Sequence, residues 1–220
     1  GRLSTSVAHE VKNPLSSIKA IVQVMREDIK KNDPLQEDLT IIVDEIDRLT
    51  KVVNQLLQFA KPGSEVKTSV RIGAVIHSTL VVLNHEAKQN KITTFCQIPN
   101  DLPEIAADEG ALKEVFFNLL RNAIQAMPSG GEIHINAHYQ PSSHAIQITV
   151  TDTGTGIAQG SFQKIFEPFY TTKQTGTGLG LSIVKKKLED MEATIHAESN
   201  GHGASFVINF PLPEPLLVQT

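Results

Sequence analysis

Residues 108–127 read DEGALKEVFFNLLRNAIQAM, and two stripes run along this segment at helical spacing. The apolar residues form one face of the predicted helix: Leu112, Val115, Phe116, Leu119, Leu120, Ala123 and Met127. Glu114, Asn118 and Asn122 follow one another at intervals of four residues and form a second stripe. The segment therefore predicts a helix that covers a core with one face and presents a row of polar groups on another.

The polar stripe has a chemical interpretation. Asparagine is a mediocre helix former, so two asparagines on one stripe suggest a use for them. Their amide oxygens suit a hard cation that keeps most of its waters and also contacts phosphates. Magnesium with a nucleotide is the natural candidate, and a merely solvated polar face is the alternative.

A second candidate segment follows at residues 145–156. The residues from Ile146 to Val150 alternate as a strand does and run into Asp152, Gly154 and Gly156. An aspartate at a strand end can accept a hydrogen bond from an exocyclic amine such as that of adenine, and the glycines let a ligand approach the backbone. A plain Asp-Gly turn is the alternative.

A glycine-rich loop precedes the last predicted helix and consists of Gly176, Thr177, Gly178, Leu179, Gly180 and Leu181. It places backbone N–H groups at a helix N-terminus, where anions bind. The loop lacks the spacing of the dinucleotide fingerprint and of the Walker-type loop. Lys173 could supply positive charge for phosphate, and the aromatic cluster at 166–170 is expected to anchor a mobile lid.

The rest of this half predicts a sheet covered by helices on one face. Helices are expected at about 71–89, 108–127 and 178–190, and strands at about 132–139, 145–151, 193–198 and 204–210. Cys96 lies in the alternating stretch 92–98 and is interpreted as core filler.

Residues 3–60 predict two long helices that pair as a hairpin. The break falls at 31–34, where Asp33 is a candidate N-cap, and Lys61 to Ser64 form the domain boundary. Because two helices cannot enclose a core, we expect a homodimer that forms a four-helix bundle. The predicted apolar seams are Val7, Val11, Ile18, Val22, Met25 and Ile29, interrupted by the helix-kinking Pro14, and Leu39, Ile42, Ile46, Leu49, Val53, Leu56 and Ala60.

His9 stands out among the eight histidines because of its helical phase. It lies about 200° around the helix from Val7 and Val11, so its side chain is expected to point away from the seam. Glu10 could accept one imidazole N–H, which would leave the other nitrogen as a nucleophile, and Asn13 lies one turn later. A solvated surface histidine is the alternative.

Bulk properties narrow the class of protein. The 220 residues suit two modest domains, and 40% hydrophobic with 20% charged residues is ordinary globular composition. A net charge of −4 argues against a nucleic-acid partner. No apolar run is long enough to span a bilayer, and a single cysteine fits a reducing compartment. We therefore expect a cytoplasmic segment, with any membrane anchor in an upstream part of the natural chain, beyond Gly1.

Taken in order, these motifs resemble one family, the sensor histidine kinases. His9-Glu-x-x-Asn13-Pro resembles the H box, and Asn118-Leu-Leu-Arg121-Asn122 the N box. The stretches Asp152-x-Gly154-x-Gly156, Phe166-Glu-Pro-Phe169 and 176–181 are similar to the G1, F and G2 boxes. The resemblance covers the chain from His9 to about Phe210, and the five motifs together are highly specific.

The resemblance implies a dimerisation and histidine-phosphotransfer domain at 1–62, an α/β sandwich that binds ATP at 63–213, and an irregular tail at 214–220. It implies an autokinase that phosphorylates His9 with Glu10 as base and passes the phosphoryl group to an aspartate of a response regulator. Asn13 implies a phosphatase activity as well. At the ATP site the resemblance implies Mg²⁺ binding by Asn122 and Asn118. It implies adenine recognition by Asp152 with help from Ser205, and phosphate binding by Lys173 and residues 176–181. Arg121, Gly154 and Gly156 are also implied to lie at this site.

Two rival functions remain open at this point. The chain could be an ATPase or serine kinase of the same ATP-binding superfamily, with the His9 helix only a dimerisation element. It could instead be a pseudokinase scaffold, although Asn122, Asp152 and the loop glycines argue against that. One departure from the family is the small number of residues between Lys173 and Gly176, which predicts a short nucleotide lid.

Overall fold

The computed structural model describes residues 2–30, 33–60, 67–173, 176–199 and 201–212, with the backbone alone for 2–9 and 58–60. The chain divides into two compact units, Gly1–Pro62 and Gly63–Thr220. The predicted boundary at Lys61 to Ser64 and the tail at 214–220 lie outside the described residues.

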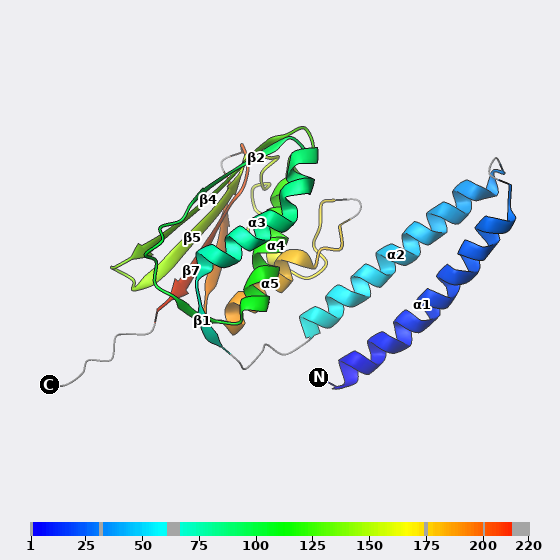
Figure 1. Cartoon of the computed structure of the whole chain (residues 1–220), viewed down its shortest axis with the longest axis horizontal. Coiled ribbons are helices and arrows are strands. Elements are labelled where there is room, and N and C mark those ends of the chain that lie inside the picture. The colour runs from blue at the N-terminus through cyan, green and yellow to red at the C-terminus, as the bar shows by residue number, and fades with distance from the viewer. Residues whose placement is uncertain (1, 31–32, 61–66, 174–175, 200, 213–220) are drawn as a thin grey trace. The chain divides into compact units, whose positions relative to one another are not determined.

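The first unit is a helical hairpin of α1 (Arg2–Asp28) and α2 (Leu35–Ala60), which lie side by side in Figure 1. Val22, Leu39 and Val43 are buried between the two helices. An ion pair between Lys19 Nζ and Asp47 Oδ1, 2.6 Å apart, also joins them. Helix α1 continues through Pro14, so the predicted weak point does not end the helix.

The turn between these helices is held by side chains that satisfy backbone groups at the helix ends. Asp33 Oδ1 accepts a hydrogen bond from the backbone N–H of Leu35 at 3.0 Å, as expected of an N-cap. Gln36 Nε2 donates to the carbonyls of Arg26 at 2.8 Å and Ile29 at 3.1 Å. The Arg26 carbonyl lies in the last turn of α1 and the Ile29 carbonyl follows directly after the helix, where acceptors are left unsatisfied.

The predicted seams are only partly buried within the hairpin. Val22, Leu39 and Ile46 are buried, as predicted. Other seam residues keep large exposed fractions, which are 38% for Val11, 47% for Ile18, 49% for Met25, 43% for Ile42, 40% for Leu49 and 46% for Leu56. One hairpin therefore leaves much of its own apolar surface uncovered.

The second unit is a two-layer α/β sandwich. Its sheet has the order β2-β4-β5-β7-β6, and α3, α4 and α5 cover one face of it (Figure 1). A separate two-stranded sheet pairs β1 (Thr68–Val70) with β3 (Ile105–Ala107). The other elements are α3 (Ile72–Gln89), β2 (Ile92–Gln97), α4 (Glu109–Ala126), β4 (Gly131–Gln140), β5 (Ala145–Asp152), the 3₁₀ turn η1 (Lys164–Phe166), α5 (Gly180–Asp190), β6 (Thr194–Glu198) and β7 (Ser205–Pro211).

The core lies between this sheet and its three helices. Alternate residues of β4 are buried, with Ile133, Ile135 and Ala137 toward the helices. The apolar face predicted for residues 108–127 is buried throughout. Cys96 is half-buried and packs against this core, and its burial raises the pKa of the thiol.

The predicted fold class, a helical hairpin followed by an α/β sandwich, is confirmed. The structure adds three strands that the sequence did not predict, namely β1, β2 and β3. Of these, β2 is an edge strand and runs parallel to β4. In the part of the chain that the structure describes, no helix is both long and apolar enough to cross a membrane.

Candidate functional site

The two asparagines of α4 face the N-terminus of α5. A side chain added at Gly180, the first residue of α5, would place its Cβ 3.5 Å from Asn118 Oδ1 and 3.9 Å from Asn122 Nδ2. Asn118 Nδ2 donates to the carbonyl of Glu114 at 2.9 Å, and this hydrogen bond orients the amide. The glycine thus keeps a space open between the amides and a helix N-terminus, where backbone N–H groups favour anions.

Glu114, the third member of the predicted polar stripe, forms an ion pair with Lys187 of α5. Its carboxylate lies 3.0 Å from Lys187 Nζ, and both side chains are about three-quarters buried, with 24% and 23% exposed. The ion pair joins α4 to α5. The carboxylate is thus engaged by a lysine, whereas the amides of Asn118 and Asn122 face the loop.

Asp152 ends β5 and is 4% exposed. Its Oδ1 accepts hydrogen bonds from the backbone N–H of Gly154 at 2.8 Å and of Ala204 at 3.3 Å. Burial raises the pKa of this carboxyl group, while the two N–H donors and the charge of Lys173 oppose the shift. The result is a fixed acceptor at a strand end, suited to a hydrogen-bond donor on a ligand.

Gly203 allows the neighbouring loop to close against this strand end. Its φ is +104°, and a Cβ there would lie 1.9 Å from the carbonyl oxygen of Asp152. Only glycine fits such a close approach in the left-handed region. Through this contact Ala204 reaches Asp152, so a residue that the sequence did not single out positions the candidate carboxylate.

Lys173 extends toward α4. Its Nζ donates to Gln125 Oε1 at 2.9 Å and more weakly to Asn122 Oδ1 at 3.4 Å. Partial burial lowers the pKa of Lys173, with Arg121 adding to the shift and Asp152 opposing it. Gln125 was not predicted as a site residue, although its place three residues after Asn122 puts it on the same side of the helix.

The glycine loop is tied to the aromatic segment before it. The backbone N–H of Phe169 donates to the carbonyl of Gly178 at 3.0 Å. Gly178 has φ +68°, and a Cβ there would lie 2.4 Å from the carbonyl carbon of Phe169. The backbone N–H of Gly176 donates to the carbonyl of Lys173 at 3.1 Å. Lys173, Gly178 and the start of α5 therefore border one space, while residues 174 and 175 lie outside the described residues.

The remaining loop residues support this arrangement. Thr177 Oγ1 accepts a hydrogen bond from the backbone N–H of Leu179 at 3.4 Å, and Leu179 is fully buried. Leu181 packs against the core. Gly154 lies against α4, because a Cβ there would be 2.7 Å from the carbonyl oxygen of Ala126. Gly156 has φ +72° and borders Gly203.

Arg121 and Ser205 occupy contrasting positions. Arg121 Nε lies 3.8 Å from Glu86 Oε1, and among the described residues this nitrogen has no hydrogen-bond partner. Ser205 pairs in register with Thr151, and the two hydroxyls are 3.0 Å apart. Because successive strand residues point to opposite faces, Ser205 lies across the sheet from the side chain of Asp152. The structure therefore separates the Ser205 side chain from Asp152, and the backbone N–H of Ala204 contacts the Asp152 carboxylate instead.

The candidate phosphoacceptor belongs to the other unit. His9 lies within α1, and its side chain is outside the described residues, as is the helical phase predicted for it. Glu10 and Asn13 are exposed on the same helix.

Two family models match the chain. Residues 1–65 match the His Kinase A (phospho-acceptor) domain, and residues 107–214 match the Histidine kinase-, DNA gyrase B-, and HSP90-like ATPase. The signal transduction histidine-protein kinase AtoS of Escherichia coli (strain K12) is 37% identical over 214 residues, which cover 96% of this chain and 35% of that protein. The sensor histidine kinase ZraS of the same organism is 36% identical over 213 residues, or 96% of this chain and 45% of that protein. The chain thus spans less than half the length of these relatives.

Solved structures agree with the family models. Full-length ShkA in complex with AMPPNP has a TM-score of 0.77 at 26% identity, covering 96% of this chain and 45% of that one. Histidine kinase ThkA in complex with the response regulator protein TrrA has a TM-score of 0.70 at 28% identity, covering 97% and 62%. The catalytic domain of ThkA alone is 31% identical with a TM-score of 0.61, over 67% of this chain and 99% of that domain. The chain therefore belongs to the sensor histidine kinases, with a phospho-acceptor hairpin and an ATPase domain.

Proposed function

We propose that the chain is an ATP-dependent protein-histidine autokinase, which phosphorylates His9 and passes the phosphoryl group to an aspartate of a response regulator. Residues 1–62 form the dimerisation and phosphotransfer domain, and residues 63–213 form the catalytic domain, followed by a tail at 214–220. One observation carries the proposal. The asparagines of α4, Lys173, the buried Asp152 and the N-terminus of α5 together border one site.

Each side of this site suits one part of ATP. Asp152 accepts a hydrogen bond from the exocyclic amine of adenine, since its Oδ1 is already fixed by two backbone donors. The phosphates bind at the N-terminus of α5, where the N–H groups of the 176–181 loop and the helix dipole favour negative charge. Lys173 adds positive charge beside Asn122, and Arg121, whose Nε lies 3.8 Å from Glu86, adds a further charge on α4.

The residues at the site fit Mg²⁺ bound together with the nucleotide. Within the described chain, no three His, Cys, Asp or Glu side chains form a group that could hold a metal by themselves. Two amide oxygens, from Asn118 and Asn122, suit an ion that keeps several waters and takes its other ligands from phosphates. Asn118 and Asn122 would hold such an ion, which would supply neutralisation of phosphate charge.

The chemical step follows from positioning. The lone pair of the unprotonated imidazole nitrogen of His9 attacks the γ-phosphorus, a P–N bond forms, and the bond between that phosphorus and the β,γ-bridging oxygen breaks. ADP leaves with the bridging oxygen, and the proton on the other imidazole nitrogen passes to Glu10. Because phosphoryl transfer depends on alignment and charge neutralisation, the ATP domain must bring its nucleotide in line with His9.

The proposed partners are a second copy of the chain and a receiver domain. The exposed apolar residues of α1 and α2 support a dimer, because two hairpins together could bury what one leaves uncovered. The structure of ThkA in complex with TrrA supports a response regulator as the phosphoryl acceptor. Asn13, exposed one turn after His9, is assigned to hydrolysis of the phosphorylated partner.

The decisive experiment is incubation of the chain with γ-labelled ATP and Mg²⁺, followed by acid and base washes. Phosphohistidine is labile in acid and stable in base, so the label should remain after the base wash and be lost in the acid wash. His9→Gln should abolish the label, whereas His138→Gln, a change of an exposed histidine on β4, should leave it unchanged. An acid-stable label, or one that persists in His9→Gln, would favour the rival serine kinase. Intact ATP binding without any label would favour the scaffold.

A further inference from the structure

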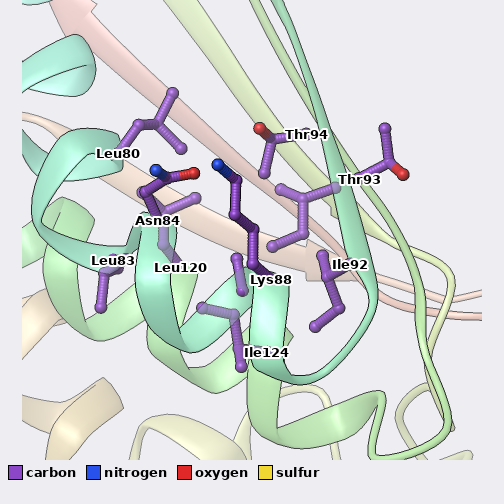
Figure 2. Close-up of a pocket in the computed structure, with 11 residues that line it drawn as sticks. Leu80, Leu83, Asn84, Lys88, Ile92, Thr93, Thr94, Leu120 and Ile124 are labelled. Atoms are coloured by element: carbon purple, nitrogen blue, oxygen red, sulfur yellow. The ribbon is translucent and has the colours of Figure 1, made fainter.

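A cavity of about 280 Å³ lies between α3, the edge strand β2 and α4 (Figure 2). None of its lining residues belongs to the candidate nucleotide site. We propose that this cavity binds a small amphiphilic carboxylate and that its occupation is coupled to nucleotide binding.

The floor of the cavity is apolar. Six lining side chains come from all three neighbouring elements and from β4, and each is at most 7% exposed. A floor of this kind offers water no hydrogen-bond partners, so hydrocarbon occupies it more favourably than solvent does. The six residues are Leu83, Ala87, Ile92, Leu120, Ile124 and Ile133.

The rim is polar and carries one positive charge. Asn84, Lys88, Thr93 and Thr94 line the cavity and are exposed. In Figure 2 the side chains of Asn84 and Lys88 extend from α3, and the nitrogen of Lys88 lies between the side chains of Asn84 and Thr94 in this view. Lys88 Nζ forms no ion pair or hydrogen bond with the rest of the described chain. An ammonium and an amide above an apolar floor are complementary to a molecule with an anionic head and a hydrocarbon tail.

The volume limits the size of the ligand. It lies just below the roughly 300 Å³ at which ligand pockets begin, so only a small ligand fits. It is about twice the roughly 150 Å³ of an engineered apolar cavity that holds benzene. A carboxylate with a chain of about eight carbons therefore matches both the volume and the rim.

Helix α4 separates this cavity from the nucleotide site. Leu120 lies two residues from both Asn118 and Asn122, which is about 200° around a helix, so the cavity and the amides occupy opposite sides of α4.

A second contact joins α3 to the same region. Glu86 of α3 lies 3.8 Å from Arg121, the residue directly before Asn122 on α4. A ligand wedged between α3 and β2 therefore bears on α4 directly and on Arg121 through Glu86. This coupling, unlike the cavity itself, rests on the proposed function of the nucleotide site.

Binding is tested with octanoate as the probe, 1-octanol as its uncharged counterpart, and the 220-residue chain with labelled isoleucine and leucine methyl groups. Octanoate should cause saturable shifts confined to the methyls of the cavity floor, and octanol should bind about fivefold more weakly, as for one exposed charge pair. Shifts spread evenly over the methyls, or equal affinities for the two probes, would overturn the proposal.

Two variants, with one control, distinguish the contribution of the Lys88 charge to binding from that of the cavity itself. Lys88→Met should lower octanoate affinity about fivefold and leave octanol affinity unchanged. Lys113→Met, at an exposed lysine of α4 outside the cavity, is the matched control and should change neither. Thr94→Leu should block both probes by filling the rim. Equal effects of the two lysine substitutions would rule out a specific role for Lys88.

The coupling is tested by titrating AMPPNP with and without saturating octanoate. An affinity change of about fivefold or more, in either direction, is expected, with the same factor for octanoate when AMPPNP is saturating. Identical affinities would overturn the coupling. Octanoate binding is measured without nucleotide, so failure of AMPPNP to bind on its own would count against the proposed function and not against the cavity.

Discussion

At the scale of single residues, Asp152 makes the most specific prediction. Two backbone N–H groups fix its Oδ1. In Asp152→Asn the amide oxygen would keep these two bonds and turn its NH₂ toward the ligand, where it would meet the adenine amine donor to donor. ATP affinity should fall about 10- to 100-fold, as for a lost hydrogen bond to a charged group.

Inosine triphosphate provides the control for this substitution, because it carries a carbonyl where adenine carries the amine. The preference for ATP over inosine triphosphate, measured by calorimetry, should shrink or reverse in Asp152→Asn. An equal loss for both nucleotides would mean that Asp152 does not contact this position of the base.

The raised pKa of Asp152 predicts two pH dependences of opposite sign. AMPPNP affinity should fall as the pH is lowered through the raised pKa, because the protonated carboxyl is a weaker acceptor. The free energy of unfolding of the nucleotide-free chain should rise as the pH falls from the raised pKa to the ordinary value, because the folded state then binds more protons than the unfolded state. Asp152→Asn should remove both pH dependences, that of AMPPNP affinity and that of the free energy of unfolding. Profiles unchanged by this substitution would show that other groups cause them.

Gly203 and Gly201 form a matched pair, since both have φ in the left-handed region, +104° and +89°. A Cβ at Gly203 would overlap the carbonyl of Asp152, whereas a Cβ at Gly201 has no heavy atom within 4 Å. Gly201→Ala should cost about 1 kcal/mol of unfolding free energy from backbone strain alone. Gly203→Ala should cost more than about 3 kcal/mol because the loop must also move. Equal losses in urea unfolding would contradict the close approach.

The sequence indicated many of the residues that the structure gathers at the candidate site, and the exceptions have physical reasons. Asn118, Asn122 and Lys173 were predicted because their residue types suit magnesium or phosphate. Ala204 acts through its backbone, which leaves no trace in a side-chain pattern. Ser205 was expected from the family resemblance, but strand alternation places its side chain on the other face of the sheet from Asp152.

At the scale of elements, long periodic segments were predictable and short or non-local ones were not. Helix α3 was expected at about 71–89 and is found at Ile72–Gln89. Strands β1 and β3 have three residues each, too few to show a period, and their pairing joins residues far apart in sequence. The alternation around Cys96 was noted but not assigned to a strand, and nothing local indicates that β2 pairs in parallel with β4.

Gln36 links the two helices of the hairpin, because its amide donates to two carbonyls at the end of α1. Gln36→Met keeps a similar side-chain length and removes both donors, so it should destabilise the hairpin by about 1–2 kcal/mol. Hydrogen exchange of the amides of α1 and α2 should accelerate accordingly, with little change in the second unit. Gln23→Met, at an exposed glutamine of α1, is the control. Equal amide exchange rates in Gln36→Met and Gln23→Met would show that Gln36 does not stabilise the hairpin.

At the scale of the whole molecule, the two units differ in how far each completes its own core. The second unit buries a continuous cluster between its sheet and helices. The hairpin buries Val22, Leu39 and Val43 together, with Ile29 packed against them. Because the exposed apolar residues of α1 and α2 are spaced as bundle seams, the hairpin is expected to need a partner helix pair to become stable.

A charge placed on the exposed seam tests this expectation. Leu49 is 40% exposed within one chain, and in a four-helix bundle it would be buried against the second copy. Leu49→Lys should therefore convert a dimer to a monomer in sedimentation equilibrium, because an unpaired ammonium cannot be buried in the apolar seam. Val81→Lys makes the same change on α3, where the valine is 76% exposed, and should leave the mass unchanged. A wild-type chain that sediments as a monomer, or a Leu49→Lys chain that stays dimeric, would show that copies do not associate through this seam. If transfer to His9 occurs between the chains of the dimer, the Leu49→Lys monomer should also lose autophosphorylation while it still binds AMPPNP.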